Sequence, residues 1–218
     1  MDASVTRSRL SRDDRMEQTL AAAHALFAER GYAAVTMDEI AAAVGVTKPL
    51  LYNYFGNKER LYTACMERAG ESLTATIAAA VGETRSPGEA LGAGVRAFFA
   101  FLDSDRAAWA VLFDETLPRA GEVADRVAAH RKRIADLVSG SMLAQLPSER
   151  RDAARVEVEA LSTALLGAAE ALARWWLRTE ALSAKDAAEL LIATVEPGLR
   201  ARSTASPASQ TPGGTTNR

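Results

Sequence analysis

Apolar residues recur along this chain at intervals of three and four positions, which is the spacing of one face of an α-helix. No stretch shows the strict alternation of apolar and polar residues that marks a β-strand. The first helix is predicted from about Arg12 to Arg30, and Gly31 is placed to end it. Its predicted inner face consists of Leu20, Ala23, Phe27 and Ala28. The pattern therefore predicts an all-α protein.

The same spacing predicts further helices along most of the chain. A linking helix is expected to begin near Lys58 and to run past Ile77. The segment Ser86-Pro87-Gly88-Glu89 has capping-box spacing with proline at the first helical position, so it begins the next helix, which runs to about residue 102. The remaining helices are expected at about 106–113, 121–146, 149–178 and 184–199.

Two short helices joined by a tight turn are predicted within residues 36–55. Thr36 and Glu39 have the spacing of a capping box, in which each side chain bonds the other residue's backbone N–H at a helix start. Gly45 is placed to end the first helix in the left-handed conformation, which glycine adopts without a Cβ clash. Thr47 is placed to cap the second helix. Together they predict a helix-turn-helix of the kind that reads DNA.

The second of these helices carries residues suited to DNA. Leu51 and Phe55 are four positions apart and are predicted to anchor its inner face. The free N–H groups of a helix N-terminus favour phosphate, and Lys and Asn side chains suit base edges. The predicted DNA contacts are Thr36, Thr47, Lys48, Pro49, Tyr52, Asn53, Tyr54 and Lys58. The alternative interpretation is an ordinary amphipathic helix pair whose polar face is only solvated.

A longer signature surrounds this motif. It consists of Phe27, Gly31-Tyr32, Thr36, Ile40-Ala41, Gly45-Val46, Leu51-Tyr52, Tyr54-Phe55, Lys58-Glu59 and Leu61. This run resembles the N-terminal domain of the TetR (tetracycline-repressor-like) family of bacterial transcription regulators. The resemblance implies a three-helix DNA-binding domain, an all-helical ligand-binding and dimerisation domain behind it, and repression relieved by a small molecule. Pro49 departs from the family pattern, in which this position is often small or glycine, so the base preference does not carry over from relatives.

Four parts are expected along the chain. They are a flexible basic arm at 1–12, a DNA-binding domain at 13–73 with its helix-turn-helix at about 36–55, a helical effector-binding and dimerisation domain at 74–202, and a tail at 203–218. The tail is rich in Ser, Thr, Pro and Gly, and it has too little apolar surface to offset the entropy of ordering, so we expect disorder.

A homodimer is predicted from the long helix at about 149–178. Its apolar and small residues cover an arc broader than the roughly 100° that one core face requires, so it needs a second covering surface. Together with the last helix, it is predicted to pair with its symmetry mate in a four-helix bundle. The predicted interface comprises Leu161, Leu165, Leu172, Trp176, Leu190, Leu191 and Val195. The alternative is a long helix buried wholly within one monomer.

An apolar effector cavity is predicted among the central aromatic residues. Its candidate lining comprises Phe98, Phe99, Trp109, Phe113, Met142 and Trp175. Trp175 and Trp176 differ by about 100° around the helix, so one is expected to face the cavity and the other the partner subunit. Few charged residues share the faces of these aromatic side chains, so the expected effector is a largely apolar small molecule. His130, among Arg126, Arg131 and Arg133, is expected on a solvated basic face.

Charge is informative through its distribution, because the formal net charge is only −2. Basic residues gather in the arm and around the second short helix: Arg7, Arg9, Arg12, Lys48, Lys58 and Arg60. The arm is either a DNA contact or a plain disordered terminus. The expected partners are double-stranded operator DNA, a second copy of the chain and an apolar small molecule.

Several classes of function are not favoured by the sequence. His24 and His130 have no partner at metal-binding spacing, and no nucleophile or cofactor motif occurs, so neither catalysis nor a cofactor is expected. No apolar run approaches the roughly 18 residues of a membrane span, and no signal-peptide pattern is present. Cys65 is the single cysteine, which suits a reducing cytoplasm. Three alternatives remain. The protein could be a regulator of the same family that activates transcription, a regulator that acts without a small-molecule inducer, or a helical binding protein that acts without DNA.

Overall fold

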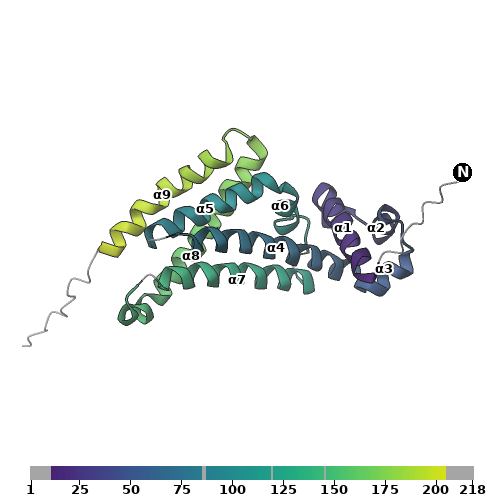
Figure 1. Cartoon of the computed structure of the whole chain (residues 1–218), viewed down its shortest axis with the longest axis horizontal. Helices are drawn as coiled ribbons and strands as arrows, with labels where there is room; N and C mark the ends of the chain where they lie inside the picture. The colour runs from purple at the N-terminus through teal and green to yellow at the C-terminus, as the bar shows by residue number, and fades with distance from the viewer. Residues whose placement is uncertain (1–10, 85–86, 119, 145, 205–218) are drawn as a thin grey trace, which may run out of the picture.

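The computed structural model describes residues 11–84, 87–118, 120–144 and 146–204. Within these ranges the regular structure consists of nine α-helices and contains no strand, which confirms the all-α prediction (Figure 1). The helices are α1 (Arg12–Ala34), α2 (Met37–Val44), α3 (Lys48–Phe55), α4 (Lys58–Gly82), α5 (Pro87–Ser104), α6 (Arg106–Leu112), α7 (Glu122–Ala144), α8 (Ser148–Thr179) and α9 (Ala184–Thr204).

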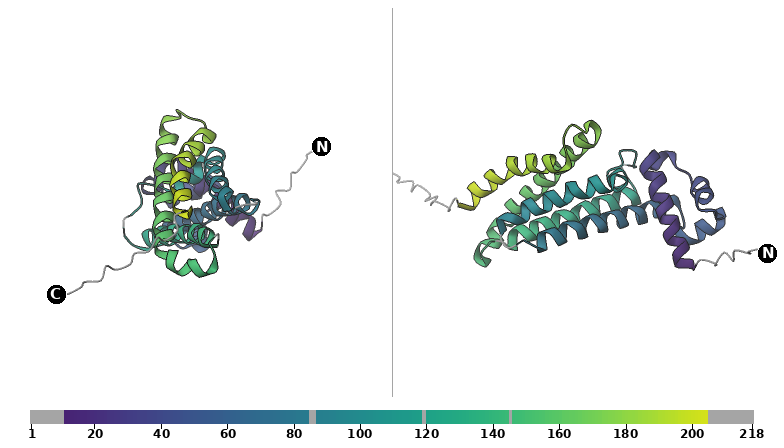
Figure 2. Two further views of the ribbon diagram at one scale, coloured as in Figure 1. Left: turned by 90° about the vertical axis from the view of Figure 1, so that its left-hand side faces the viewer. Right: turned by 45° about the horizontal axis from the view of Figure 1, so that its top comes forward.

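The helices form two groups along an elongated molecule. Helices α1, α2 and α3 gather at one end, and α4 leads from this end into the other group (Figure 1). The long helices α4, α5, α7, α8 and α9 run roughly along the long axis, whereas short α6 lies where the two groups meet (Figures 1 and 2). None of the helices in the described ranges combines the length and the apolar character that a bilayer span requires.

The ends of α1 differ in part from the sequence prediction. Ser11 caps the helix and forms a capping box with Asp14, so Arg12 is the first helical residue and not part of an arm. The predicted arm contacts of Arg7 and Arg9 lie outside the described residues. Gly31 interrupts the helix with φ 77°, a left-handed value that favours glycine, and a further short turn continues to Ala34.

The last helix continues beyond its predicted end near residue 199. Pro197 lies inside α9 and removes one backbone donor without ending the helix, which runs to Thr204. The first two residues of the predicted disordered tail, Ser203 and Thr204, are therefore helical, and the rest of that tail lies outside the described residues. At the other end of α9, Ser183 caps the helix as expected, because its Oγ accepts the Asp186 N–H at 3.1 Å.

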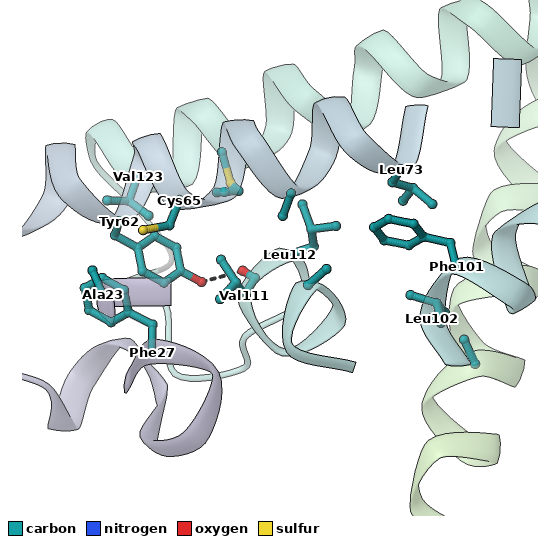
Figure 3. Close-up of a cluster of buried hydrophobic side chains, with 14 of the residues drawn as sticks. Ala23, Phe27, Tyr62, Cys65, Leu73, Phe101, Leu102, Val111, Leu112 and Val123 are labelled. Atoms are coloured by element: carbon teal, nitrogen blue, oxygen red, sulfur yellow. Dashed lines mark hydrogen bonds between the residues drawn. The ribbon is translucent and has the colours of Figure 1, made fainter. Parts of the chain in front are cut away.

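Buried side chains connect the two helix groups without a break. Phe27 of α1 and Tyr62 of α4 meet edge to face with ring centroids 5.0 Å apart (Figure 3). The hydroxyl of Tyr62 donates a 2.5 Å hydrogen bond to the Val111 carbonyl of α6, and burial raises the pKa of this phenol. Cys65 is fully buried beside this cluster, and burial raises its pKa to about 12. Residues of α1, α4 and α6 thus share one core.

Candidate DNA-binding surface and effector cavity

The capping box at the start of α2 forms as predicted. The Thr36 Oγ1 accepts the Glu39 N–H at 3.3 Å, and the Glu39 carboxylate accepts the Thr36 N–H at 2.8 Å and its hydroxyl at 2.7 Å. Arg30 of α1 adds an ion pair to Glu39 at 2.8 Å. The hydrogen bonds from Thr36 and Arg30 lower the pKa of Glu39 to about 2. The side chain of Thr36 is therefore engaged in the N-terminal cap of α2.

The turn between α2 and α3 also has the predicted backbone. Gly45 adopts φ 66° and ψ 34°, and the N–H of Val46 donates to the Ala41 carbonyl at 3.0 Å. Thr47 occupies the N-cap position of α3, but its side chain makes no capping hydrogen bond, which corrects the prediction. The backbone carbonyl of Thr47, and not its hydroxyl, accepts the Leu51 N–H at 3.1 Å.

One face of α3 is solvent-exposed and the opposite face is buried. Leu51 is 0% exposed and Phe55 is 9% exposed, so both anchor the helix as predicted. The face turned to solvent carries five of the predicted contact residues, namely Thr47, Lys48, Pro49, Tyr52 and Asn53. Their side chains combine one cation, hydroxyl and amide groups and an apolar ring, which are the groups that contact phosphates, base edges and thymine methyls.

The cation on this face is held by the neighbouring helix. The Lys48 Nζ lies 2.8 Å from the Asp38 Oδ2 of α2. This hydrogen bond and the adjacent carboxylate charge raise the pKa of Lys48. The pair braces α3 against α2, and it partly neutralises the positive charge that the helix presents. The pair leaves no pattern in the sequence, because the two residues come together only once the helices are packed.

Tyr54 and Lys58, also predicted as DNA contacts, turn towards α1 instead. Tyr54 is half-buried, and the Arg12 guanidinium lies 5.7 Å from its ring centroid. The Lys58 ammonium lies 4.4 Å from the centre of the Tyr32 ring and 3.4 Å from the Ala33 carbonyl. Burial lowers the pKa of Lys58. Both side chains thus help to hold α3 and α4 against α1, and they stay partly exposed, so their predicted contact with DNA stays a prediction.

A cavity of about 1080 Å³ lies among α4, α5, α7 and α8. Its wall is mainly aliphatic and aromatic, with Leu73, Ile77, Leu91, Val95, Phe98, Phe113, Ile134, Val138, Met142, Leu161 and Leu165 among the lining residues. Along α4 the lining extends from Met66 to Gly82, which corresponds to about 24 Å of helix. The cavity is therefore long and apolar, as the site of a small hydrophobic molecule would be.

The structure revises the predicted lining. Phe98, Phe113 and Met142 line the cavity, but Phe99, Trp109 and Trp175 do not. Phe99 is 0% exposed and packs against Trp176, with ring centroids 5.7 Å apart. Trp109 stacks on Phe113 with ring centroids 4.0 Å apart, and Trp175 is exposed at the surface. Apart from Met142 of α7, the walls from α4 and α7 were not predicted, although Leu73, Ile77 and Val81 of α4 share the four-residue spacing of one helix face.

Polar residues also line the cavity, among them His130, Arg131, Lys132, Arg150, Glu157 and Glu170. His130 lines the cavity and is 7% exposed, so the prediction of a solvated basic face was wrong. The packing of α7 against α4 turns its imidazole inward over Gly70. Beside it, the Arg131 guanidinium pairs with the Glu170 carboxylate of α8 at 3.1 Å. Arg131 also lies over the ring of Phe113, 5.5 Å from its centroid.

The predicted dimer residues occupy several environments. Leu161 and Leu165 line the cavity, and Leu172 and Val195 pack partly buried against the core of their own subunit. Trp176 is 3% exposed and its Nε1–H donates to the Leu182 carbonyl at 2.8 Å, while Leu191 is 5% exposed. Leu190 is 51% exposed and stays available to a partner. Burial in their own subunit therefore argues against Leu165, Trp176 and Leu191 as interface residues, whereas Leu161, Leu172, Leu190 and Val195 keep exposed surface.

The loop after α6 connects the wall of the cavity to the helix-turn-helix unit. The carboxylate of Asp114 accepts the backbone N–H of Tyr32 at 2.6 Å, and the hydroxyl of Thr116 accepts the N–H of Ala33 at 3.3 Å. Both donors lie directly after the left-handed Gly31, where an added Cβ would meet the Thr116 Oγ1 at 3.0 Å. Asp114 directly follows Phe113, a lining residue of the cavity. A single peptide unit thus separates the two sites.

Comparisons with known proteins cover both helix groups. Residues 20–65 match the family described as "Bacterial regulatory proteins, tetR family", and residues 87–196 match "Tetracyclin repressor-like, C-terminal domain". The chain is 33% identical over 181 residues to the HTH-type transcriptional activator FasR of Mycolicibacterium smegmatis, an alignment that covers 83% of this chain and 80% of FasR.

Solved structures share the whole arrangement. A TetR-like transcriptional regulator from Rhodococcus sp. RHA1 is similar with a TM-score of 0.70 and 32% identity over 88% of this chain and 99% of that one. AibR, solved in complex with isovaleryl coenzyme A and operator DNA, is similar with a TM-score of 0.67 and 25% identity over 84% of this chain and 98% of AibR.

Proposed function

Because the chain belongs to the TetR family of DNA-binding bacterial transcription regulators, we propose that it is a dimeric repressor that leaves its operator when an apolar small molecule fills the cavity. Proteins of this family regulate transcription and are not enzymes. The observation that carries the proposal is the one-residue separation between Phe113 in the cavity wall and Asp114 at the DNA-binding unit.

On the DNA side, we infer that α3 enters the major groove with its exposed face. Thr47, Lys48 and Pro49 lie at its N-terminal end, where recognition helices present their base-reading residues. Tyr52 and Asn53 extend the same face by one turn. The AibR complex with operator DNA supports this assignment, because the two folds correspond over most of both chains.

For assembly, we propose an interface on the outer faces of α8 and α9. Exposed residues of α8 recur with spacings of four, three and four, and these are Ala164, Ala168, Ala171 and Trp175. Leu190 of α9, which is 51% exposed, adds a large apolar side chain. The small side chains allow two helices to approach closely, and a two-fold axis would bring four such helices together in a bundle.

The effector follows from the shape and lining of the cavity. A length of about 24 Å along α4 and a predominantly apolar wall suit an extended hydrophobic molecule better than a compact polar one. The isovaleryl coenzyme A bound to AibR supports an acyl-type ligand. A ligand that separates α7 from α4 or α6 would displace Phe113, and with it the hydrogen bond that Asp114 makes to Tyr32.

Activation of transcription is the second candidate. It is favoured by the similarity to FasR, which is named a transcriptional activator and aligns with most of this chain. The DNA-binding surface and the cavity serve both outcomes, because the direction of control depends on where the operator lies relative to the promoter. A transcription assay on the bound promoter distinguishes the two.

A combined ligand screen tests the proposed function. A hydrophobic compound that binds the folded state should raise the unfolding temperature by mass action, and an effector should also lower the affinity for operator DNA. Stabilising compounds confined to polyanions without an apolar chain would contradict the apolar cavity. Compounds that stabilise the protein and never release DNA would contradict the inducer role.

A further inference from the structure

We propose that the ion pair of Lys48 and Asp38 reads one G·C base pair of the operator, with the ammonium on guanine and the carboxylate on the amino group of cytosine. This inference rests on the proposed function, because it requires α3 to lie in the major groove. It makes Asp38 of α2 a specificity-determining residue, and it assigns the operator a G·C pair at one position of each half-site.

The pair lies on the exposed surface that α2 and α3 share at one end of the molecule (Figure 1). The Lys48 Nζ is 2.8 Å from the Asp38 Oδ2, and the two side chains remain 50% and 65% exposed. Lys48 is the first residue of α3, and Asp38 is the second residue of α2. Wherever the ammonium meets the duplex, the carboxylate therefore lies within hydrogen-bond distance of the same place.

Asp38 takes no part in the capping box of α2. Glu39 fills that role through its hydrogen bonds with Thr36, and Arg30 pairs with Glu39. In the described part of the chain, the Asp38 carboxylate accepts a hydrogen bond from the Lys48 ammonium. A carboxylate has two oxygens and can accept several hydrogen bonds, so Asp38 can accept a further donor while it holds Lys48.

The pair suits a base edge better than a phosphate. Its charges cancel and the carboxylate repels phosphate oxygens, so the pair adds little attraction to the DNA backbone. The start of α3 also offers few donors to phosphate, because Pro49 has no N–H and the next two N–H groups donate to the Thr47 carbonyl at 3.0 and 3.1 Å. In the major groove, the base donors open to a carboxylate are the amino groups of cytosine and adenine.

The spacing of the two charged groups matches that of a G·C pair. Guanine O6 accepts an N–H of cytosine N4 in the base pair, so these atoms lie about 2.9 Å apart, close to the 2.8 Å between the Lys48 Nζ and the Asp38 Oδ2. Guanine presents O6 and N7 to the groove as acceptors, and cytosine N4 presents its second N–H as a donor. The ammonium and the carboxylate therefore meet two adjacent groups of the complementary kind.

The same geometry disfavours the other base pairs. In an A·T or a C·G pair, an amino group takes the place of guanine O6 and a carbonyl oxygen takes the place of cytosine N4, so both contacts become repulsive. A T·A pair keeps the favourable order of these two groups. It replaces guanine N7 with the thymine methyl, however, and it brings adenine N7, an acceptor, beside the carboxylate. Asp38 thus adds a repulsive element against the wrong bases.

Selection of binding sites from a random duplex pool, followed by affinity measurements with the full chain, tests this proposal. Lys48→Ala identifies the position, because loss of the ammonium relaxes the preference for guanine there. In the wild type, exchange of this G·C pair for A·T or C·G should weaken binding about tenfold or more, which is typical of a well-placed base contact. Asp38→Asn should reduce this penalty to about threefold or less, because its amide also donates to thymine O4 or guanine O6.

The ratio of affinities for two duplexes separates base reading from a general effect of charge. Glu29→Gln removes one negative charge from α1 and is the matched control, so it should preserve every base preference. The proposal would be overturned if Asp38→Asn changed the affinity for all duplexes by one factor. It would also be overturned if Lys48→Ala weakened all sequences alike, or if the two variants relaxed different positions. Unchanged binding by a Lys48→Ala, Tyr52→Ala double variant would instead contradict the proposed role of α3, and this inference with it.

Discussion

The carboxylate of Asp114 accepts the backbone N–H of Tyr32 at 2.6 Å, and this hydrogen bond joins the loop after α6 to the end of α1. Tyr32 follows the left-handed Gly31 and stacks beside Phe27 in the core of the DNA-binding unit. Asp114 follows Phe113, whose ring lines the cavity and lies under the Arg131 guanidinium. A displacement of Phe113 by a ligand would therefore act on α1 through one peptide unit.

Asp114→Ala should weaken the coupling between the cavity and the DNA. The Tyr32 N–H loses its acceptor in a partly buried place, so we expect a loss of about 1–2 kcal/mol in the free energy of unfolding. A stabilising ligand should still bind, but it should release less operator DNA. Asp114→Asn keeps an acceptor oxygen and serves as the control. Fluorescence anisotropy measures how much operator DNA the ligand releases. If the ligand releases as much DNA from Asp114→Ala as from the wild type, this path is ruled out.

Lys48→Ala should weaken DNA binding from the exposed face of α3. We expect a loss of about 1–3 kcal/mol in specific affinity if the ammonium reads a base edge. If it contacts phosphate, all sequences weaken alike and the salt dependence becomes shallower. Asp38→Asn removes the charge that holds Lys48 at 2.8 Å and should tighten binding at low salt. Titrations at several salt concentrations separate these outcomes, and equal affinities throughout would remove Lys48 from the interface.

Leu190→Glu should disrupt assembly. This side chain is 51% exposed in the subunit, so the substitution is tolerated by the monomer, whereas a dimer would bury the charge without a partner. We expect association to weaken by several kcal/mol, on the order of the cost of an unpaired buried charge. Leu190→Ala is the matched control and should remain a weaker dimer. Light scattering that finds an intact dimer for Leu190→Glu would place the interface elsewhere.

The capping box of α2 should contribute to stability in a defined pH range. The pKa of Glu39 is about 2 in the folded protein, below its ordinary value near 4.5, so the carboxylate favours the folded state above that ordinary value. This contribution should disappear as the pH falls from about 4.5 through 2. Glu39→Gln should therefore flatten the acid side of the curve of unfolding temperature against pH. Glu29→Gln, an exposed change outside the cap, should leave that curve unaltered.

Features that depend on neighbouring residues along the chain could be predicted from the sequence. The box of Thr36 and Glu39, the left-handed Gly45, and the buried pair Leu51 and Phe55 all formed as expected. Each involves residues within four positions of one another, so local backbone geometry decides the outcome. The helix-turn-helix could therefore be predicted from the sequence alone.

Features that depend on how helices face one another could not be predicted. The 100° offset of Trp175 and Trp176 separates the two rings, but packing against Phe99 of α5 decides that Trp176 is the buried one. His130 is flanked by arginines along the chain, yet α7 turns it onto Gly70. Lys58 similarly lies over Tyr32 because α4 begins beside the end of α1. These contacts join residues that are many positions apart, so the spacing of residues along the sequence does not predict them.

Binding to a duplex from the region upstream of the protein's own coding sequence tests the central claim most directly. The wild-type protein should bind this duplex specifically, and its affinity should fall steeply as salt rises. A folded Lys48→Ala, Tyr52→Ala double variant should lose that binding, because both side chains lie on the exposed face of α3. Unchanged binding by the double variant would contradict the account and place the DNA-reading surface elsewhere on the molecule.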